Sequence, residues 1–374
     1  MRDETTRRKE IWRSLFAGER LDRVPLDIRV SGNSAPPIRA QMQNCDVQLG
    51  EALKMVRSSW QLGACTDWIP AMRPDVGCSC LATAFGAEYY WGENPNQTPG
   101  ILEPIVTDLD GGVTRLPDPD PYVDGWLPEG LMRIKRFAEA GDGYVPVSLL
   151  DAAGGLNVAA DLVGVSELLI ALYTDPDAIH ELLKKIQRLF VRTIDAGIEA
   201  AGGEEYITTT DFPDFWFPEG LKGHVSDDLS ANFGPDTYET FSAPYHAVVL
   251  ERFGTGGLHN CGPNPCYEAY VDQPVAPISI DLSDSYSHDD LPAFKRSLSG
   301  RGFIYLTFDK LLDKEREPVG WYTEIMESCS PDLIVVPVVF ASNPDEGISL
   351  FQKLEPIAVE YARRVNWGWP RRSD

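Results

Sequence analysis

Segments with a helical spacing of apolar residues alternate with short apolar runs through the second half of this chain. Apolar positions three and four residues apart predict helices that each bury one face. The short runs contain few polar residues, which is typical of parallel strands buried on both faces. The predicted helices cover residues 159–172, 176–201, 235–253, 292–298, 319–329 and 346–365, and the predicted strands cover 144–150, 205–210, 278–282, 303–308 and 333–339.

The first half predicts fewer elements and longer connections. Ile11, Leu15 and Phe16 share one helical face, and Gly18 ends that helix. Asn, Asp, Gly and Pro concentrate in two stretches that predict loops. The predicted elements are a helix at 4–17, a strand at 24–30 and a helix at 47–62, and the predicted loops are 91–99 and 106–121.

The alternation of strands and helices, repeated close to eight times, predicts an α/β fold of the (β/α)8 TIM barrel type. Residues 1–374 are expected to form a single barrel domain with an additional N-terminal helix and loops. In this fold the reactive groups gather at the carboxyl ends of the strands. Arg29, Asp211, His259 and Asp281 all lie at such ends, so they are candidate site residues.

Composition and charge narrow the class of protein. The chain has 43% hydrophobic and 24% charged residues, which is sufficient for a substantial core. Its formal net charge of −24 argues against a nucleic acid partner, because binding to phosphates relies on Lys and Arg. No apolar run approaches the roughly 20 residues that span a bilayer, so no membrane partner is expected. The seven cysteines and the absence of a signal peptide predict reduced thiols in the cytoplasm.

A His-x-Cys pair lies in the segment Gly256–Pro265, which reads Gly-Gly-Leu-His-Asn-Cys-Gly-Pro-Asn-Pro. His259 and Cys261 are two residues apart, so on a strand their side chains leave the same face. Imidazole and thiolate bind zinc at about 2.0–2.3 Å, a reach that this spacing allows. The pair predicts a metal site at a strand end; the alternative is a buried histidine beside an ordinary core cysteine.

Other candidates surround this pair in the predicted fold. Arg29 either holds a substrate carboxylate by a bidentate fork or pairs with one of the chain's own acids. Asp211 follows a predicted strand, and Asp228 is the member of the Asp227-Asp228 pair expected to face the pocket. Both carboxyls, together with Arg29, are expected to be catalytic. Phe215 and Trp216 belong to an aromatic loop that would suit a flat ligand, such as a corrin or an aromatic methyl ether.

Residues 227–262 resemble the uroporphyrinogen decarboxylase superfamily. The segment begins Asp-Asp-Leu-Ser-Ala-Asn-Phe-Gly-Pro, continues through Phe-Ser-Ala-Pro-Tyr-His and ends Leu-His-Asn-Cys-Gly. It is most similar to the methylcobamide:thiol methyltransferase branch. The Arg-rich motif of the decarboxylases is matched only in part, by Arg-Val-Pro-Leu-Asp-Ile-Arg-Val-Ser-Gly at residues 23–32.

The resemblance implies a zinc site and a methyl transfer. Its ligands would be His259, Cys261 and Asp281, the last matching an acidic position one strand downstream. A later cysteine of the branch is replaced here by Phe-Ala-Ser-Asn-Pro at 340–344, so water, a thiol or Cys266 would complete the site. The implied protein is a zinc-dependent methyltransferase that moves a methyl group between a corrinoid, carried by a partner protein, and a thiol or methylated small molecule.

Two alternatives remain at this point. One is a tetrapyrrole decarboxylase, in which Arg29 would hold side-chain carboxylates and Asp67 would steady the pyrrole nitrogens. The other is a barrel that binds a corrinoid or tetrapyrrole without catalysis, which the missing cysteine would favour. The sequence leaves the methyl donor, the acceptor and the oligomeric state open.

Overall fold

The structure is a computed structural model that describes residues 2–31, 35–308 and 317–369. Its main sheet has six parallel strands in the order β1-β8-β7-β6-β5-β4, and a small antiparallel pair joins β2 and β3. The strands are β1 (Asp27–Val30), β2 (Tyr89–Tyr90), β3 (Gly100–Ile101), β4 (His224–Ser226), β5 (Gly257–His259), β6 (Ser279–Ser283), β7 (Phe303–Thr307) and β8 (Ile334–Ala341).

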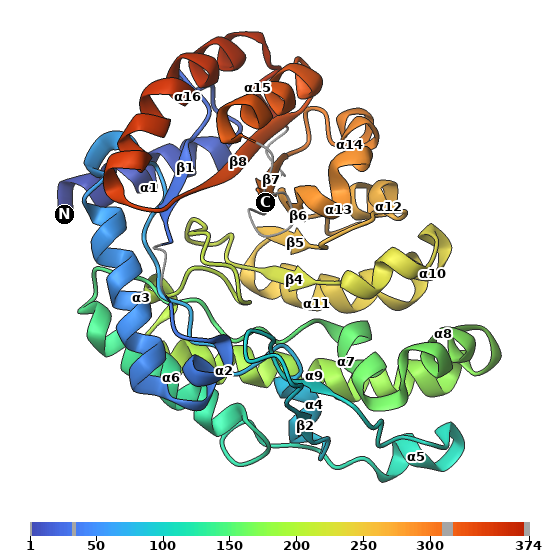
Figure 1. Ribbon diagram of the computed structural model, residues 1–374. Coiled ribbons are helices and arrows are strands. Elements are labelled where there is room, and N and C mark those ends of the chain that lie inside the picture. The colour runs from blue at the N-terminus through green and yellow to red at the C-terminus, as the bar shows by residue number, and fades with distance from the viewer. Residues whose placement is uncertain (1, 32–34, 309–316, 370–374) are drawn as a thin grey trace.

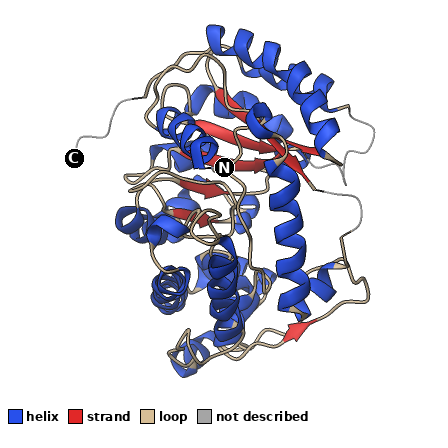
Figure 2. Cartoon of the chain, turned by 90° about the vertical axis from the view of Figure 1, so that its left-hand side faces the viewer, coloured by secondary structure: helices blue, strands red, loops and turns tan. Residues whose placement is uncertain are grey.

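Helices surround these strands (Figures 1 and 2). The helices α15 and α16 pack against β8, and α16 also contacts β1. In the described residues the helices are α1 (Arg2–Phe16), α2 (Ile38–Gln43), α3 (Cys45–Trp60), α4 (Cys80–Ala84), α5 (Leu109–Arg115), α6 (Leu127–Gly141), α7 (Gly155–Val163), α8 (Val165–Thr174), α9 (Pro176–Ala201), α10 (Pro235–Phe241), α11 (Ala243–Phe253), α12 (Tyr267–Asp272), α13 (Asp284–Ser287), α14 (Leu291–Ser297), α15 (Pro318–Cys329) and α16 (Pro344–Arg364).

Single bridged residues close the sheet into a ring. Parallel bridges join Met72 to Val147 and Val147 to Ile207, which extends the ring beyond the six strands. The two remaining joins are hydrogen bonds, from the Asp67 amide to the Leu26 carbonyl (2.8 Å) and from the Thr210 amide to the Lys222 carbonyl (2.9 Å). The α/β barrel expected from the sequence is therefore confirmed.

Strand register places the inward side chains in layers. His259 pairs with Ser226 on β4 and with Asp281 on β6, and Asp281 pairs with Tyr305 on β7. Paired residues of parallel strands point to the same side of the sheet, so these side chains share one inward layer. His224 lies two residues before Ser226, one inward layer closer to the amino-terminal end of the strands.

Helix α1 packs at that amino-terminal end. The Trp12 ring lies 5.5 Å from the Tyr305 ring, and the Phe16 ring lies 5.1 Å from Phe303 and 4.8 Å from Phe217, between ring centroids. The fully buried Arg8 donates a hydrogen bond to the Trp68 carbonyl (2.5 Å). The N-terminal helix predicted at 4–17 thus covers the closed end of the barrel and leaves the carboxyl-terminal end of the strands for a site.

Several predicted elements differ from the structure. The strands predicted at 144–150 and 205–210 reduce to the bridged residues Val147 and Ile207, and residues 204–206 form a short 3-10 helix. The helix predicted at 159–172 breaks at Gly164, whose φ of 99° lies in a region that favours glycine. The helix predicted at 235–253 breaks at Ser242, between α10 and α11.

Helices α5 and α6 were missed. The first lies within the loop predicted at 106–121. The second buries Leu127, Leu131, Ile134 and Phe137, an amphipathic spacing that the sequence does contain. In the part of the chain that is described, no single helix is long and apolar enough to cross a membrane; α7 and α8 reach that length only together and meet at 109°.

Candidate functional site

Three side chains converge at the carboxyl ends of β4 and β5. The Nε2 atom of His259 lies 3.2 Å from the Cys261 Sγ and 3.5 Å from the Asp228 Oδ1. His259 ends β5, Cys261 follows two residues later, and Asp228 begins the short 3-10 helix after β4. The ligand atoms of these three residues all lie within 4.8 Å of one another.

Hydrogen bonds position the loop that carries the Cys261 thiol. The Cys261 amide donates to the Asp228 Oδ1 (2.8 Å), and the Ser287 hydroxyl donates to the Cys261 carbonyl (2.8 Å). Gly262 has a φ of 113°, and a Cβ there would lie only 2.3 Å from the Ser287 hydroxyl. Asn260 is fully buried behind the loop and donates to the Tyr270 hydroxyl (2.9 Å). The thiol is therefore held toward the imidazole by its backbone.

Asp281 orients the imidazole from the opposite side. Its Oδ2 lies 2.9 Å from the His259 Nδ1. Burial alone would lower the pKa of His259, but the Asp281 carboxylate, the Cys261 hydrogen bond and the Asp228 carboxylate outweigh it and raise that pKa well above its ordinary value. A carboxylate on one ring nitrogen leaves the other to bind a cation, which is the usual arrangement of a metal-bound histidine.

The donor set fits a zinc-type cation. Zinc bonds of about 2.0–2.3 Å in tetrahedral geometry place the ligand atoms roughly 3.3–3.6 Å from one another. The distances of 3.2 and 3.5 Å from the His259 Nε2 to its two neighbours are close to that spacing. Imidazole, thiolate and carboxylate make three ligands, and the fourth position would be left for a substrate atom or water.

A cavity of about 460 Å³ opens beside His259 and Cys261. Phe212 stands edge-on to the His259 ring, with centroids 5.1 Å apart. The cavity is lined by the aromatic side chains Phe212, Phe215, Tyr286 and Phe340, by Arg29 and Arg73, and by Asp214 and Asp281 among others. A flat or partly apolar small molecule can therefore reach the open ligand position.

The structure assigns Asp228 and Asp281 different places from those expected. Asp281 was expected as a metal ligand, yet it contacts Nδ1, the ring nitrogen that points away from the Cys261 thiol. Asp228 was expected as a catalytic acid in the pocket, and its Oδ1 lies beside Nε2 and the Cys261 amide. In this geometry Asp228 is the third ligand candidate, and Asp281 is the residue that orients the histidine.

Arg29 lines the cavity but its guanidinium is already paired. It donates to both Asp27 oxygens (2.8 and 2.9 Å) and to the Asp214 Oδ1 (2.6 Å). Its carbon also lies 4.7 Å from the Trp68 ring centroid and 5.0 Å from that of Phe215. Burial opposes the charge, but the Asp214 and Asp27 carboxylates outweigh it and raise the pKa of Arg29. The second of the two expected arrangements, pairing with the chain's own acids, is the one observed.

Asp211 does not face the cavity. It is fully buried, its Oδ1 accepts a hydrogen bond from the Ala152 amide (3.3 Å), and its Oδ2 lies 3.6 Å from the His224 Nδ1. His224 is also fully buried, in the layer below His259. The structure therefore places the Asp211 carboxyl in the core and not at this cavity, because the loop after Ile207 turns inward.

The aromatic loop divides between the cavity and the core. Phe215 lines the cavity and stacks on Tyr305, with centroids 4.0 Å apart. Trp216 points the other way, where Lys9 and Lys222 lie about 5 Å from its ring. Both residues were expected to contact a ligand, and only Phe215 is placed to do so. Successive residues of an extended chain face opposite sides, which separates these neighbours.

Sequence reasoning missed Arg73 and Asp151. The Arg73 Nη2 donates to the Asp151 Oδ2 (2.9 Å), and the Arg73 guanidinium lies 4.7 Å from the Phe212 ring centroid. Burial raises the pKa of Asp151 to about 7 although Arg73 opposes the rise. Asp151 directly follows the apolar run 144–150, so the rule that selected Asp211 would also have selected it. Cys266, the alternative third sulfur, is fully buried and bonds the Phe233 carbonyl (3.3 Å).

Comparisons with known proteins extend this picture. A family profile described as uroporphyrinogen decarboxylase (URO-D) matches residues 8–298. Among solved structures, a methyltransferase from Methanosarcina mazei has a similar fold, with a TM-score of 0.64 and 17% sequence identity, over 95% of this chain and 98% of that chain. No curated protein sequence matches this chain significantly.

Proposed function

Because this chain belongs to the uroporphyrinogen decarboxylase family, we propose that its barrel is a zinc-dependent methyltransferase that moves a methyl group between a corrinoid and a thiol or methylated small molecule. The observation that carries the proposal is the convergence of Asp228, His259 and Cys261 at the end of an aromatic cavity. The resemblance of residues 227–262 to the thiol methyltransferase branch supports the same reaction class. The corrinoid would be carried by a partner protein.

The residues around the proposed metal have separate tasks. When bound, zinc would lower the pKa of a substrate thiol so that the nucleophilic thiolate forms near neutral pH. Asp281 holds the His259 ring so that Nε2 faces the cation. Asp228 and Cys261 supply anionic ligands, and Phe212 and Phe215 form an apolar wall that excludes water from the reacting atom.

The decarboxylase alternative is less well supported by the site. That reaction was expected to use the Arg29 guanidinium for substrate carboxylates and Asp67 for pyrrole nitrogens. Arg29 is engaged by Asp27 and Asp214. Asp67 is fully buried and pairs with Arg7 and Arg23. Both side chains are thus already paired with charged groups of the chain.

Metal analysis and methyl transfer test the proposal together. We expect about one zinc per chain in the purified wild type and none in His259→Ala or Cys261→Ala, whereas His224→Ala, a matched buried histidine, retains it. We further expect the wild type to convert methylcobalamin and 2-mercaptoethanol to cob(I)alamin, the methyl thioether and a proton, followed anaerobically by the cobalamin spectrum. A wild type that binds no metal, or binds it without methyl transfer, would contradict the proposal; the second outcome would favour a binding protein.

A further inference from the structure

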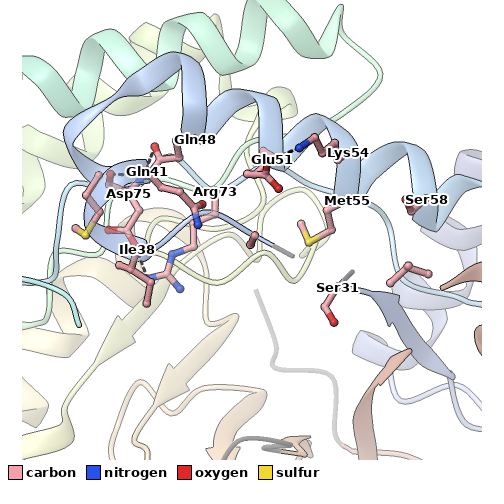
Figure 3. Close-up of a pocket in the computed structure, with 14 residues that line it drawn as sticks. Ser31, Ile38, Gln41, Gln48, Glu51, Lys54, Met55, Ser58, Arg73 and Asp75 are labelled. Carbon is pink, nitrogen blue, oxygen red and sulfur yellow. Dashed lines mark hydrogen bonds and ion pairs between the residues drawn. The ribbon is translucent and has the colours of Figure 1, made fainter. Parts of the chain in front are cut away.

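A second cavity meets the site at Arg73. This cavity, of about 580 Å³, lies between the end of β1, α2 and α3 (Figure 3). Arg73 lines both cavities, and its guanidinium carbon lies 4.7 Å from the Phe212 ring, which is in turn 5.1 Å from the His259 ring. Those two distances place the guanidinium within about 10 Å of the proposed metal ligand. The two cavities therefore adjoin at the Arg73 side chain.

Arg73 has an unused donor at this junction. Its Nη2 lies 2.9 Å from the Asp151 Oδ2 and 3.7 Å from the Asp75 Oδ2. Its Nε atom is buried and has no hydrogen-bond partner among the described residues. A buried donor without an acceptor is costly, so the position favours a ligand that brings an acceptor.

The charges around Arg73 select the kind of acceptor. Burial opposes the charge of the guanidinium, but the Asp75 and Asp151 carboxylates outweigh it and raise the pKa of Arg73. The charge is thus already balanced by Asp75 and by the ionised fraction of Asp151, whose pKa is about 7. A carboxylate or sulfonate on the ligand would be repelled by both, whereas an ether, amide or carbonyl oxygen would not.

The wall of the second cavity is preformed and combines apolar with polar side chains. Gln48 exchanges hydrogen bonds with the backbone of Asp75, donating to its carbonyl (2.9 Å) and accepting from its amide (3.2 Å). This exchange fixes α3 against the segment that carries Arg73. Unbranched methionine side chains adapt to ligands of irregular shape. The apolar lining consists of Val30, Ala35, Ile38, Met42, Ala52 and Met55, and the polar lining includes Ser31, Gln41, Gln48, Glu51, Lys54 and Ser58.

We propose that this second cavity is the distal half of the substrate site. Its ligand is an uncharged, elongated small molecule whose reacting sulfur or methylated atom lies at Asp228, His259 and Cys261. A neutral oxygen of that molecule lies at the Arg73 guanidinium, and an apolar tail lies between α2 and α3. This inference rests on the proposed function, since it names the substrate class of the same site.

Thiol binding to the cobalt-substituted full-length protein tests this inference. Three probes are compared by the thiolate-to-cobalt absorption band: N-butyl-3-mercaptopropanamide, 3-mercaptopropanoate and 2-mercaptoethanol. Each binds as the thiolate and releases its proton to the buffer. The long amide should bind at least ~10-fold more tightly than either of the others, because it alone combines a neutral acceptor with an apolar tail.

Substitutions test which side chains cause the tighter binding of the long amide. Arg73→Lys keeps the charge but moves the donor, and Ala52→Trp fills the cavity. Each should reduce the affinity of the long amide relative to 2-mercaptoethanol from ~10-fold to about equal. Arg252→Lys, at an exposed arginine paired with Asp195, is the matched control and should change nothing. Met55→Trp replaces Ala52→Trp if the latter misfolds.

The two hypotheses fail in distinguishable ways. If no thiol produces the cobalt band, the proposed function is wrong. If 2-mercaptoethanol produces it but the long amide binds no more tightly, or the carboxylate binds best, the substrate class inferred from Arg73 is wrong while the metal site stands. Retention of the amide preference in a folded cavity-filling variant would also overturn the inference.

Discussion

Two buried histidine–aspartate pairs lie in successive layers of the barrel and have different surroundings. In the upper pair, His259 and Asp281 form a 2.9 Å hydrogen bond beside a cavity, a thiol and a further carboxylate. In the lower pair, His224 and Asp211 are 3.6 Å apart and fully buried. Neither ring nitrogen of His224 has a hydrogen-bond partner in the described parts of the chain.

A single aromatic side chain separates the pairs. The Phe212 ring stands edge-on to both histidines, with centroids 5.1 Å from His259 and 6.1 Å from His224. Register explains the layers, because His259 pairs with Ser226 whereas His224 pairs with Gly257. A shift of two residues along a strand therefore decides whether the same two residue types face a ligand or belong to the core.

The largest difference in zinc affinity between the two layers is expected when each histidine is removed. His259→Ala should weaken zinc binding by more than ~100-fold, since loss of a ligand exceeds the effect of losing a supporting residue. His224→Ala should leave zinc affinity unchanged, because its ring is sealed from the cavity. Competition with a chromophoric chelator measures both affinities. Equal losses in the two variants would mean that the layers are not functionally distinct.

Removing each carboxylate should give a smaller difference. Asp281→Asn keeps the size of the side chain but weakens its hold on the His259 Nδ1, and should lower zinc affinity by about 10–100-fold. Asp211→Asn should leave zinc affinity within experimental error. The same chelator competition applies, with near-UV circular dichroism to confirm folding. An Asp281→Asn protein with wild-type affinity would refute the orienting role.

A third histidine–aspartate pair, Asp227 with His246, shows how a buried carboxyl affects the stability of the folded protein. Their side chains are 3.6 Å apart, and burial raises the pKa of Asp227 to about 7 and lowers that of His246 to about 3. The pKa of Asp227 is near 4 in the unfolded chain and about 7 in the folded protein. Between these two pH values Asp227 binds more protons in the folded state, so its contribution to the free energy of unfolding falls as pH rises. His246 binds fewer protons when folded between about pH 3 and 6.5, so it acts in the opposite direction.

Asp227→Asn separates these two contributions. At pH 8 the free energy of unfolding of the variant should exceed that of the wild type by roughly 1–2 kcal/mol. This is less than the whole pKa shift would give, because the protein relaxes around a buried charge. At pH 4 the two proteins should be almost equally stable. His246 is present in both proteins, so its effect cancels. Urea unfolding at the two pH values measures the difference. A gain of equal size at both would show that Asp227 is not protonated in the folded protein.

The smallest effect on zinc affinity is expected for the hydrogen bond that supports the loop carrying Cys261. Ser287→Ala removes the hydrogen bond to the Cys261 carbonyl and should lower zinc affinity by about 2–5-fold, in keeping with about 1 kcal/mol for such a bond. Ser297→Ala, which removes a hydroxyl contact to a helix carbonyl far from the loop, is the control. No change in the first variant would indicate that the loop needs no support from α13.

The fold could be predicted where the apolar pattern is uninterrupted. The runs at 278–282, 303–308 and 333–339 became β6, β7 and β8 because buried parallel strands need apolar residues on both faces. The runs at 144–150 and 205–210 contribute only bridged residues. Pro146, which lacks an amide hydrogen, lies in the first run, and a 3-10 turn begins the second.

The site could be predicted in part. The spacing of His259 and Cys261 was sufficient to place both at one strand end. The positions of Asp228 and Asp281 around the His259 ring were not predictable, because they depend on which ring nitrogen each carboxylate meets and therefore on the register of β4, β5 and β6. The different directions of Phe215 and Trp216 follow from extended backbone and could have been inferred.

The pairing of β1 with β8 has a consequence for biosynthesis. Asp27 and its partner Val338 are about 310 residues apart in the chain. At a translation rate of about 5–20 residues per second, the first strand emerges roughly 15–60 s before the last. During that interval one edge of β1 lacks its partner, so the nascent chain presents an open strand whose protection from other chains must come from outside the barrel.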